Sequence, residues 1–202
     1  MAGRRERRDA VYWDTCIWLA WFGEETRKSG EIEGIQEDVE QFERGDVFLA
    51  TSPIILPEML NLSNRLTSRQ KDRFEKFFDR SDVIKIAPDI SVCRIAQRLR
   101  DYYFTQHQTD GLPTLDIGDA LHLACAIRYN CLAFHTFDEN DVRKPSKPKR
   151  GLIGLSGNVA GYALTIRKPH AVQPRLQLVQ PSPRVERDDD ATSKAVGDGQ
   201  GQ

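Results

Sequence analysis

Four acidic residues from distant parts of the 202-residue chain could form one catalytic site. Each lies just after an apolar segment of strand-like composition, or in the first turn of the helix that precedes such a segment. Carboxylates that crowd together repel one another unless hard divalent cations such as Mg²⁺ or Mn²⁺ share their oxygens. Two such ions can activate a water and stabilise the leaving oxygen in phosphodiester hydrolysis. The four residues are Asp14, Glu58, Asp119 and Asp138.

Each acid also has an ordinary structural interpretation. Asp14 could cap the helix that follows it, and Asp119 could share a capping arrangement with Asp116, because Asp is a favoured N-cap residue. Glu58 could be a solvated helix residue, and Asp138 a turn residue. None of these interpretations explains why all four acids occur beside the same kind of element, so we keep the hypothesis of a shared site.

Alternating strand and helix patterns predict the scaffold that would bring the acids together. Pro57 lies inside one predicted helix and should cause a kink or a later start. Crossover helices between the strands imply a parallel α/β sheet covered on both faces, with a site outside the carboxyl ends of the strands. The predicted strands are 10–13, 46–50, 83–87, 131–135 and 152–155, and the predicted helices are 15–22, 32–44, 53–66, 68–80, 91–104 and 116–129, with a loop at 106–113.

The charge balance restricts how this chain could bind nucleic acid. The formal net charge is −1, so binding through the whole surface is not expected, and a local basic patch would have to serve. The segment 143–150 carries five positive charges and no acid, directly after Asp138. It could contact phosphates through Lys144, Lys147, Lys149 and Arg150, or it could simply be a soluble surface loop.

The two ends of the chain differ in composition from its centre. Residues 169–202 have no aromatic side chain and end in a low-complexity run, so we predict a disordered tail, with residues 1–9 as a flexible arm and 10–168 as the folded domain. The longest apolar run has seven residues, too few for a membrane span. The four cysteines lack a CxxC pair and favour reduced thiols of a cytoplasmic protein without a membrane segment.

Four segments resemble, in order, the motifs of the PIN-domain ribonucleases. Their acids are 44, 61 and 19 residues apart, and the resemblance covers roughly residues 10–155. Each motif is short, and the specificity lies in the ordered set. The segments are Val11-Tyr12-Trp13-Asp14-Thr15-Cys16, Thr51-Ser52-Pro53-Ile54-Ile55-Leu56-Pro57-Glu58, Gly118-Asp119-Ala120-Leu121-His122-Leu123-Ala124-Cys125-Ala126 and His135-Thr136-Phe137-Asp138.

This resemblance implies a PIN-like three-layer α/β sandwich with a parallel central sheet flanked by helices. It further implies an endoribonuclease dependent on Mg²⁺ or Mn²⁺, often the toxin of a VapC-type toxin–antitoxin pair, with RNA as substrate and a small antitoxin as partner. Carried over by motif, the four acids would hold the metal ions. Asp141 would be a secondary acid, and Thr136 would orient the loop of Asp138 through its hydroxyl.

Two alternatives stay open at this point. The chain could be a non-catalytic RNA-binding PIN-like module, or a regulatory interaction protein that uses its Trp-rich first helix. A homodimer is a further expectation for this protein. His122 could approach the acids, but packing is its commoner role. Trp13, Trp18 and Trp21 could stack on bases, yet their apolar neighbours favour core or dimer packing.

Overall fold

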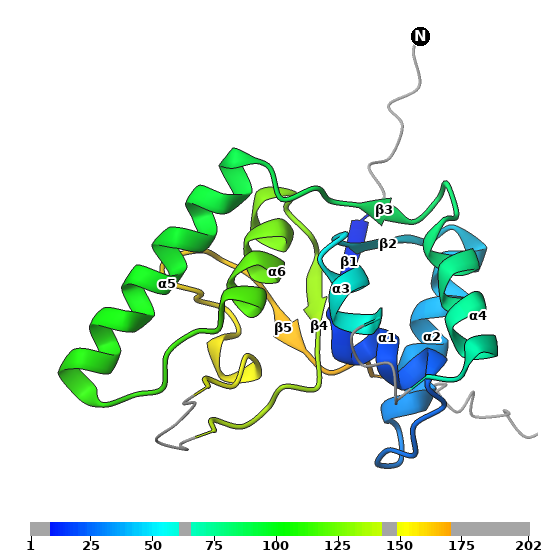
Figure 1. Ribbon diagram of the computed structural model, residues 1–202, viewed down its shortest axis with the longest axis horizontal. Coiled ribbons are helices and arrows are strands. Elements are labelled where there is room, and N and C mark those ends of the chain that lie inside the picture. Colours follow the sequence, from blue (N-terminus) through cyan, green and yellow to red (C-terminus); the bar gives the residue numbers. More distant parts are fainter. Residues whose placement is uncertain (1–8, 61–65, 143–148, 171–202) are drawn as a thin grey trace, which may run out of the picture. The chain divides into compact units, whose positions relative to one another are not determined.

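A five-stranded parallel sheet organises the protein. The computed structural model describes residues 9–60, 66–142 and 149–170. Within these, the strand order is β3-β2-β1-β4-β5, and all four pairings are parallel (Figure 1). The elements are β1 Asp9–Trp13, α1 Thr15–Phe22, α2 Glu31–Arg44, β2 Val47–Thr51, α3 Ile55–Leu60, α4 Ser68–Phe78, β3 Ile84–Lys85, α5 Ile90–Asp110, α6 Ile117–Arg128, β4 Ala133–His135, a 3₁₀ turn at Ile153–Leu155, and β5 Ile166–Arg167.

Alternate residues of the central strand enter two separate cores, because successive strand side chains point to opposite faces. Tyr12 packs in the core that contains α5 and α6, whereas Val11 and Trp13 pack in the core that contains α1, α2 and α4. Figure 1 shows these two helical groups on either side of the sheet. The three-layer α/β sandwich with a parallel central sheet is therefore confirmed.

Aromatic packing explains the Trp-rich first helix. Trp18 is fully buried and stacks on Phe22, with Phe74 and Phe77 of α4 edge-on against it. Trp13 is also fully buried and lies edge-on to Trp18. Trp13 and Trp18 thus stabilise the core, as their apolar neighbours predicted, and neither is exposed for stacking on a base.

Three predicted elements differ in the structure. α3 begins at Ile55, which places Pro57 in its first turn, where the missing N–H needs no helical partner; the predicted extension to residue 66 runs into residues 61–65, outside the described residues. α5 continues to Asp110 and ends on Gly111 in a left-handed conformation, so the predicted loop 106–113 is mostly helix. The predicted strand 152–155 is instead a 3₁₀ turn, and the fifth strand is β5.

The sequence also gave expectations about the chain ends, membrane-spanning helices and the cysteines. Residues 1–8 of the predicted arm and most of the predicted tail fall outside the described residues, whereas Asp9, which was predicted to end the arm, is the first residue of β1. No helix within the described part of the chain is long and apolar enough to cross a membrane. The four cysteines are all free thiols, as the sequence predicted.

Candidate active site

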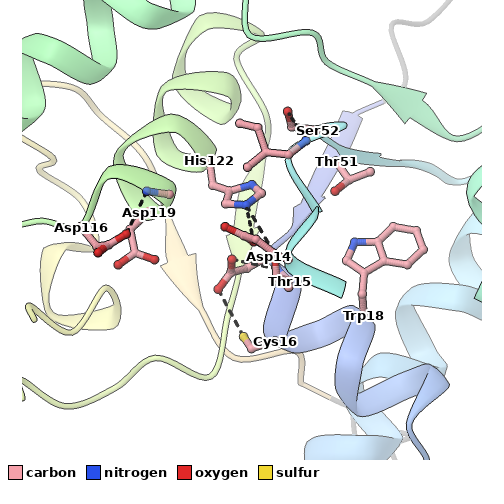
Figure 2. Close-up of polar contacts among 12 residues, drawn as sticks. Asp14, Thr15, Cys16, Trp18, Thr51, Ser52, Asp116, Asp119 and His122 are labelled. Atoms are coloured by element: carbon pink, nitrogen blue, oxygen red, sulfur yellow. Dashed lines mark hydrogen bonds and ion pairs between the residues drawn. The ribbon is translucent and has the colours of Figure 1, made fainter. Parts of the chain in front are cut away.

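The four predicted acids lie at the carboxyl end of the sheet, on four different elements. Asp14 directly follows the central strand β1, and Glu58 lies on α3 after β2. Asp119 lies in the first turn of α6, and Asp138 follows β4, which pairs with β1. Figure 2 shows Asp14 and Asp119 in the same region of the structure. The sheet topology therefore brings together residues that are up to 124 positions apart.

Asp14 is buried and each of its carboxylate oxygens is hydrogen-bonded. Its Oδ1 accepts from the Thr15 amide at 2.8 Å, which makes it the N-cap of α1. Its Oδ2 accepts from the Thr136 hydroxyl at 2.7 Å and from the Cys16 thiol at 3.2 Å. The capping interpretation is correct, but capping uses only one oxygen, and the other oxygen is oriented by side chains around it.

Glu58 directs one carboxylate oxygen to the interior of the site, while about one-third of its side chain stays exposed to solvent. Its Oε2 accepts a hydrogen bond from the Thr15 hydroxyl and lies 3.1 Å from His122 Nε2. The buried Tyr12 hydroxyl lies 2.7 Å from His122 Nδ1. Burial alone would raise the pKa of Glu58, but its hydrogen bond with His122 and the charge of that ring lower it below its ordinary value.

The His122 ring is almost fully buried, and both of its ring nitrogens contact a neighbouring side chain. Burial would lower the pKa of His122, but the hydrogen bond to Glu58 and the charges of Asp14, Glu58 and Asp119 raise it above its ordinary value. Figure 2 shows the ring directed from α6 toward Thr15. His122 therefore does approach the acids. Its Nε2 contacts Glu58, and its Nδ1 contacts the Tyr12 hydroxyl.

Gly118 allows this close approach between α3 and α6. A Cβ at this position would lie 2.8 Å from Glu58 Oε1, closer than side-chain carbons pack. The Asp116 side chain accepts a hydrogen bond from the Gly118 amide at 3.0 Å and is the N-cap of α6. A side chain at 118 would therefore displace the Glu58 carboxylate from its place against the first turn of the helix.

Asp119 and Asp138 share a single cation supplied by the protein. The Lys149 ammonium lies 3.3 Å from Asp119 Oδ2 and 2.8 Å from Asp138 Oδ2. Burial raises the pKa of Asp119 to about 7, with the charges of Asp14 and Asp138 adding to it and Lys149 opposing. Burial would lower the pKa of Lys149, but the two carboxylates raise it above its ordinary value.

The Thr136 hydroxyl joins the loop of Asp138 to Asp14. It accepts a hydrogen bond from the Asp138 amide at 3.1 Å and donates to Asp14, and it is fully buried. This is the contact through which the sequence resemblance expected Thr136 to orient the loop. Asp141 is exposed, and its Oδ1 accepts from the Gly151 amide at 3.0 Å.

The donor chemistry at this edge fits a hard divalent cation, although the present arrangement is closed around Lys149. Asp119 Oδ2 and Asp138 Oδ2 are shielded from solvent and accept no hydrogen bond of good geometry from any described residue. Their only charge partner there is an ammonium, so a cation already occupies the position between them. Among the described residues, no three His, Cys, Asp or Glu side chains converge closely enough to hold a metal ion as they stand.

The predicted phosphate-binding residues do not share one location. Lys144 and Lys147 lie outside the described residues, and Lys149 faces the acids as described above. Arg150 is buried: its Nε donates to the Pro113 carbonyl at 3.0 Å and its guanidinium lies over the Tyr103 ring. The expectation that Arg150 contacts phosphate is therefore wrong for this arrangement, because its donors serve the core.

Sequence reasoning missed the roles of Thr15 and Tyr12. Thr15 follows Asp14 in the first motif, and its hydroxyl faces Glu58 because the helix begins there. Tyr12 alternates with Val11 and Trp13, so its side chain points to the α6 face and reaches His122. The strand period contained this signal, but the identity of the partner required the packing of α6 on the sheet.

The family model of the PIN domain matches residues 11–147 of the chain. This match spans more than half of the sequence and includes all four acids, and the protein therefore belongs to the PIN-domain family. No curated protein matches the chain significantly.

Solved structures give a similar result at the level of the fold. The chain is similar to VapBC2 from Rickettsia felis, crystallised with a DNA fragment from their promoter, at 16% identity, covering 78% of this chain and 98% of that one, with a TM-score of 0.52. It is also similar to VapC20 of Mycobacterium tuberculosis, described as a sarcin-ricin loop cleaving toxin, at 15% identity, 63% and 89% coverage and a TM-score of 0.47. A third similar structure is FitAcB from Neisseria gonorrhoeae, at 18% identity, 63% and 87% coverage and a TM-score of 0.42.

Proposed function

We propose that the protein is a metal-dependent endoribonuclease that hydrolyses RNA phosphodiester bonds. The observation that supports this best is the meeting of the acids of all four motifs at one edge of the sheet. Solvent-shielded carboxylate oxygens with no amide or hydroxyl donor are typical ligands of a hard cation. In the proposed reaction the protein contributes no nucleophile of its own, since activated water attacks phosphorus.

The acids Asp14, Glu58, Asp119 and Asp138 would hold Mg²⁺ or Mn²⁺, with Asp141 as a secondary acid. When bound, these ions supply Lewis-acid activation of water and stabilisation of the leaving oxygen. The rest of the work belongs to neighbouring side chains. Thr136 orients Asp14 and the Asp138 loop, and His122 with Thr15 orients Glu58, so that two of the four acids need no rearrangement of the core.

We further propose that the enzyme is the toxin of a VapC-type pair, with a small antitoxin protein as its partner. The family membership and the motif set support this proposal, as does the similarity in fold to VapBC2. The cytoplasmic location and the homodimer expected from the sequence stay predictions. A short reading frame beside the gene, encoding a protein that co-purifies with this chain and blocks cleavage, would support the pairing; no such protein would contradict it.

The direct test is RNA cleavage by purified protein with and without divalent cations. Wild type should cleave a mixed-sequence RNA in Mg²⁺ or Mn²⁺, stop after chelation, and recover when the ion returns. Asp14→Asn and Asp119→Asn should each lower the rate by about 100-fold or more, since each removes a ligand charge from the site. Asp116→Asn is the matched control, because Asn caps a helix as well as Asp does and the Asp116 side chain accepts from the Gly118 amide of its own helix.

A second outcome would identify the non-catalytic alternative. Wild-type cleavage rates in Asp14→Asn and Asp119→Asn would show that these acids are not the site. RNA binding without any cleavage, and without dependence on divalent ions, would favour an RNA-binding module in which the acids serve the fold alone.

A further inference from the structure

Lys149 occupies an unusual position for a residue of a basic surface segment. Its ammonium bridges Asp119 and Asp138, and its side chain is only about one-third exposed. Both oxygens that it contacts are shielded from solvent and have no other charge partner among the described residues. A single positive charge therefore stands where two carboxylates from different elements would otherwise repel each other.

The backbone at Lys149 is held from both sides. Its amide and carbonyl exchange hydrogen bonds with Val142 at 2.8 and 2.6 Å, in an antiparallel bridge. The next residue, Arg150, donates its amide to the Thr114 carbonyl at 3.1 Å and buries its guanidinium against Pro113. The lysine is thus delivered to the acids by the fold, whereas its four-carbon stem can move without moving the backbone.

We propose that Lys149 is a built-in counter-cation that competes with the divalent ion for Asp119 and Asp138 and must withdraw before the ion binds. This inference rests on the proposed metal site. Without an ion, the ammonium neutralises part of the acidic cluster and keeps it folded. With an ion, the higher charge and the preference of carboxylate oxygens for hard cations displace the ammonium. The lysine therefore sets the concentration of divalent ion at which the enzyme becomes loaded.

The chain contains a matched control for this arrangement. Lys168 also bridges two carboxylates, at 3.0 Å from Glu31 and 2.8 Å from Glu139, but neither belongs to the four acids. Replacing Lys149 or Lys168 with Met makes the same change in charge and volume. Only the first replacement should alter metal binding, because only the first removes a competitor from the site.

The experiment measures Mn²⁺ affinity by titration calorimetry and by the paramagnetic resonance signal of free Mn²⁺, on the full chain. Lys149→Met should bind Mn²⁺ about tenfold more tightly than wild type, equivalent to about 1.4 kcal/mol of lost competition. Lys168→Met should bind with wild-type affinity. Lys149→Arg keeps the positive charge, so it should lack most of the increase in Mn²⁺ affinity expected for Lys149→Met.

Thermal unfolding gives a second readout that does not depend on activity. Without metal, Lys149→Met should melt at a lower temperature than wild type, because Asp119 and Asp138 lose their counter-cation. Saturating Mn²⁺ should stabilise Lys149→Met more than wild type, as expected for tighter binding to the folded state alone. Lys168→Met should gain the same stabilisation as wild type.

The outcomes separate this inference from the proposed function. Unchanged or weaker Mn²⁺ affinity in Lys149→Met, together with normal RNA cleavage, overturns the competition and leaves the nuclease intact. If neither wild type nor Lys149→Met binds Mn²⁺, both the proposed metal site and the competition by Lys149 are overturned. If Lys149→Met does not fold, a crystal structure of wild type with Mn²⁺ decides the matter: an ion bound while the ammonium still bridges Asp119 and Asp138 contradicts the proposal.

Discussion

The two halves of the acidic site are held in different ways. In the first half, which we call the anchored half, Asp14 and Glu58 accept hydrogen bonds from hydroxyl, thiol, amide and imidazole groups of buried or partly buried residues. In the second, the lysine-paired half, Asp119 and Asp138 depend on the ammonium of Lys149. The comparison shows that one site can combine carboxylates oriented by the core with carboxylates that are only neutralised.

The pKa shifts of one acid from each half, Glu58 and Asp119, have opposite directions. Hydrogen bonding to His122 overcomes burial and lowers the pKa of Glu58, so that carboxylate is favoured in its charged form. Burial dominates at Asp119 and raises its pKa to about 7, even with Lys149 beside it. The anchored half is therefore prepared to bind a cation, whereas the lysine-paired half has an energetic reason to acquire one.

The largest effect on stability is expected in the anchored half, from Thr136→Val. This change keeps the shape but removes the hydroxyl that donates to Asp14 and accepts from the Asp138 amide. The free energy of unfolding should fall by about 2 kcal/mol, because two buried groups lose their partner. Urea unfolding measures the change. Thr136→Ser, which keeps the hydroxyl, should recover most of the loss, and an equal loss in both variants would assign the effect to packing instead.

In the lysine-paired half, Asp119→Asn should raise the free energy of unfolding in metal-free buffer, opposite to the effect of Thr136→Val. The folded state holds the Asp119 proton with a pKa of about 7, above the ordinary value of 3.8, so wild type loses stability as pH rises from about 4 to 7. The variant lacks this loss and should be more stable than wild type at pH 8, with little difference at pH 4. Urea unfolding across this pH range measures the difference.

Asp116→Asn serves as the control for that pH series, since it changes the same residue type at the N-cap of the same helix. Its stability relative to wild type should not vary across the range. A wild-type protein that gains stability between pH 4 and 8 relative to Asp119→Asn would contradict the assignment of a raised pKa to this carboxyl group.

A smaller loss is expected from Tyr12→Phe, behind the anchored half. Burial first, and the neighbouring charges after it, raise the pKa of Tyr12, so its hydroxyl stays protonated and shares a hydrogen bond with His122 Nδ1. Removing the hydroxyl should cost about 1 kcal/mol in urea unfolding. Tyr102→Phe, at an exposed ring on α5, should cost almost nothing. Equal costs would show that the ring, rather than its bond to His122, supports Glu58.

The smallest effect is expected from the double variant Lys144→Gln and Lys147→Gln. It tests whether these two lysines contact RNA, in contrast to Lys149, which pairs with the acids. These two residues touch no proposed metal ligand in the hypothesis from sequence, so cleavage at saturating RNA should persist. If they contact phosphates of a single strand, the slope of log K against log salt should flatten by about 0.7 per contact. Binding at several salt concentrations measures it, and an unchanged slope would remove both residues from the RNA surface.

Several fold elements were predictable because their signals are local. Asp14 before an apolar helix and Gly23 after it predict α1, and the structure has that helix with those ends. The end of α5 was not predictable in the same way, since its last two turns carry few apolar residues and their helix is stabilised by Arg150 bonding to Gln106. β5 is only two residues long, too short for a pattern, and it forms because β4 offers an open edge.

The sequence by itself determined the order of the motifs, and with it the parallel sheet and the four acids at its carboxyl edge. Those features follow from strand period, caps and chain order, which are properties of neighbouring residues. Only the tertiary structure decided that His122 contacts Glu58, that Arg150 turns into the core, and that Lys149 lies between Asp119 and Asp138. Each of these depends on the path of a loop or on the packing of a helix against the sheet. Such contacts join residues far apart in the chain, and no local pattern encodes the distance between them.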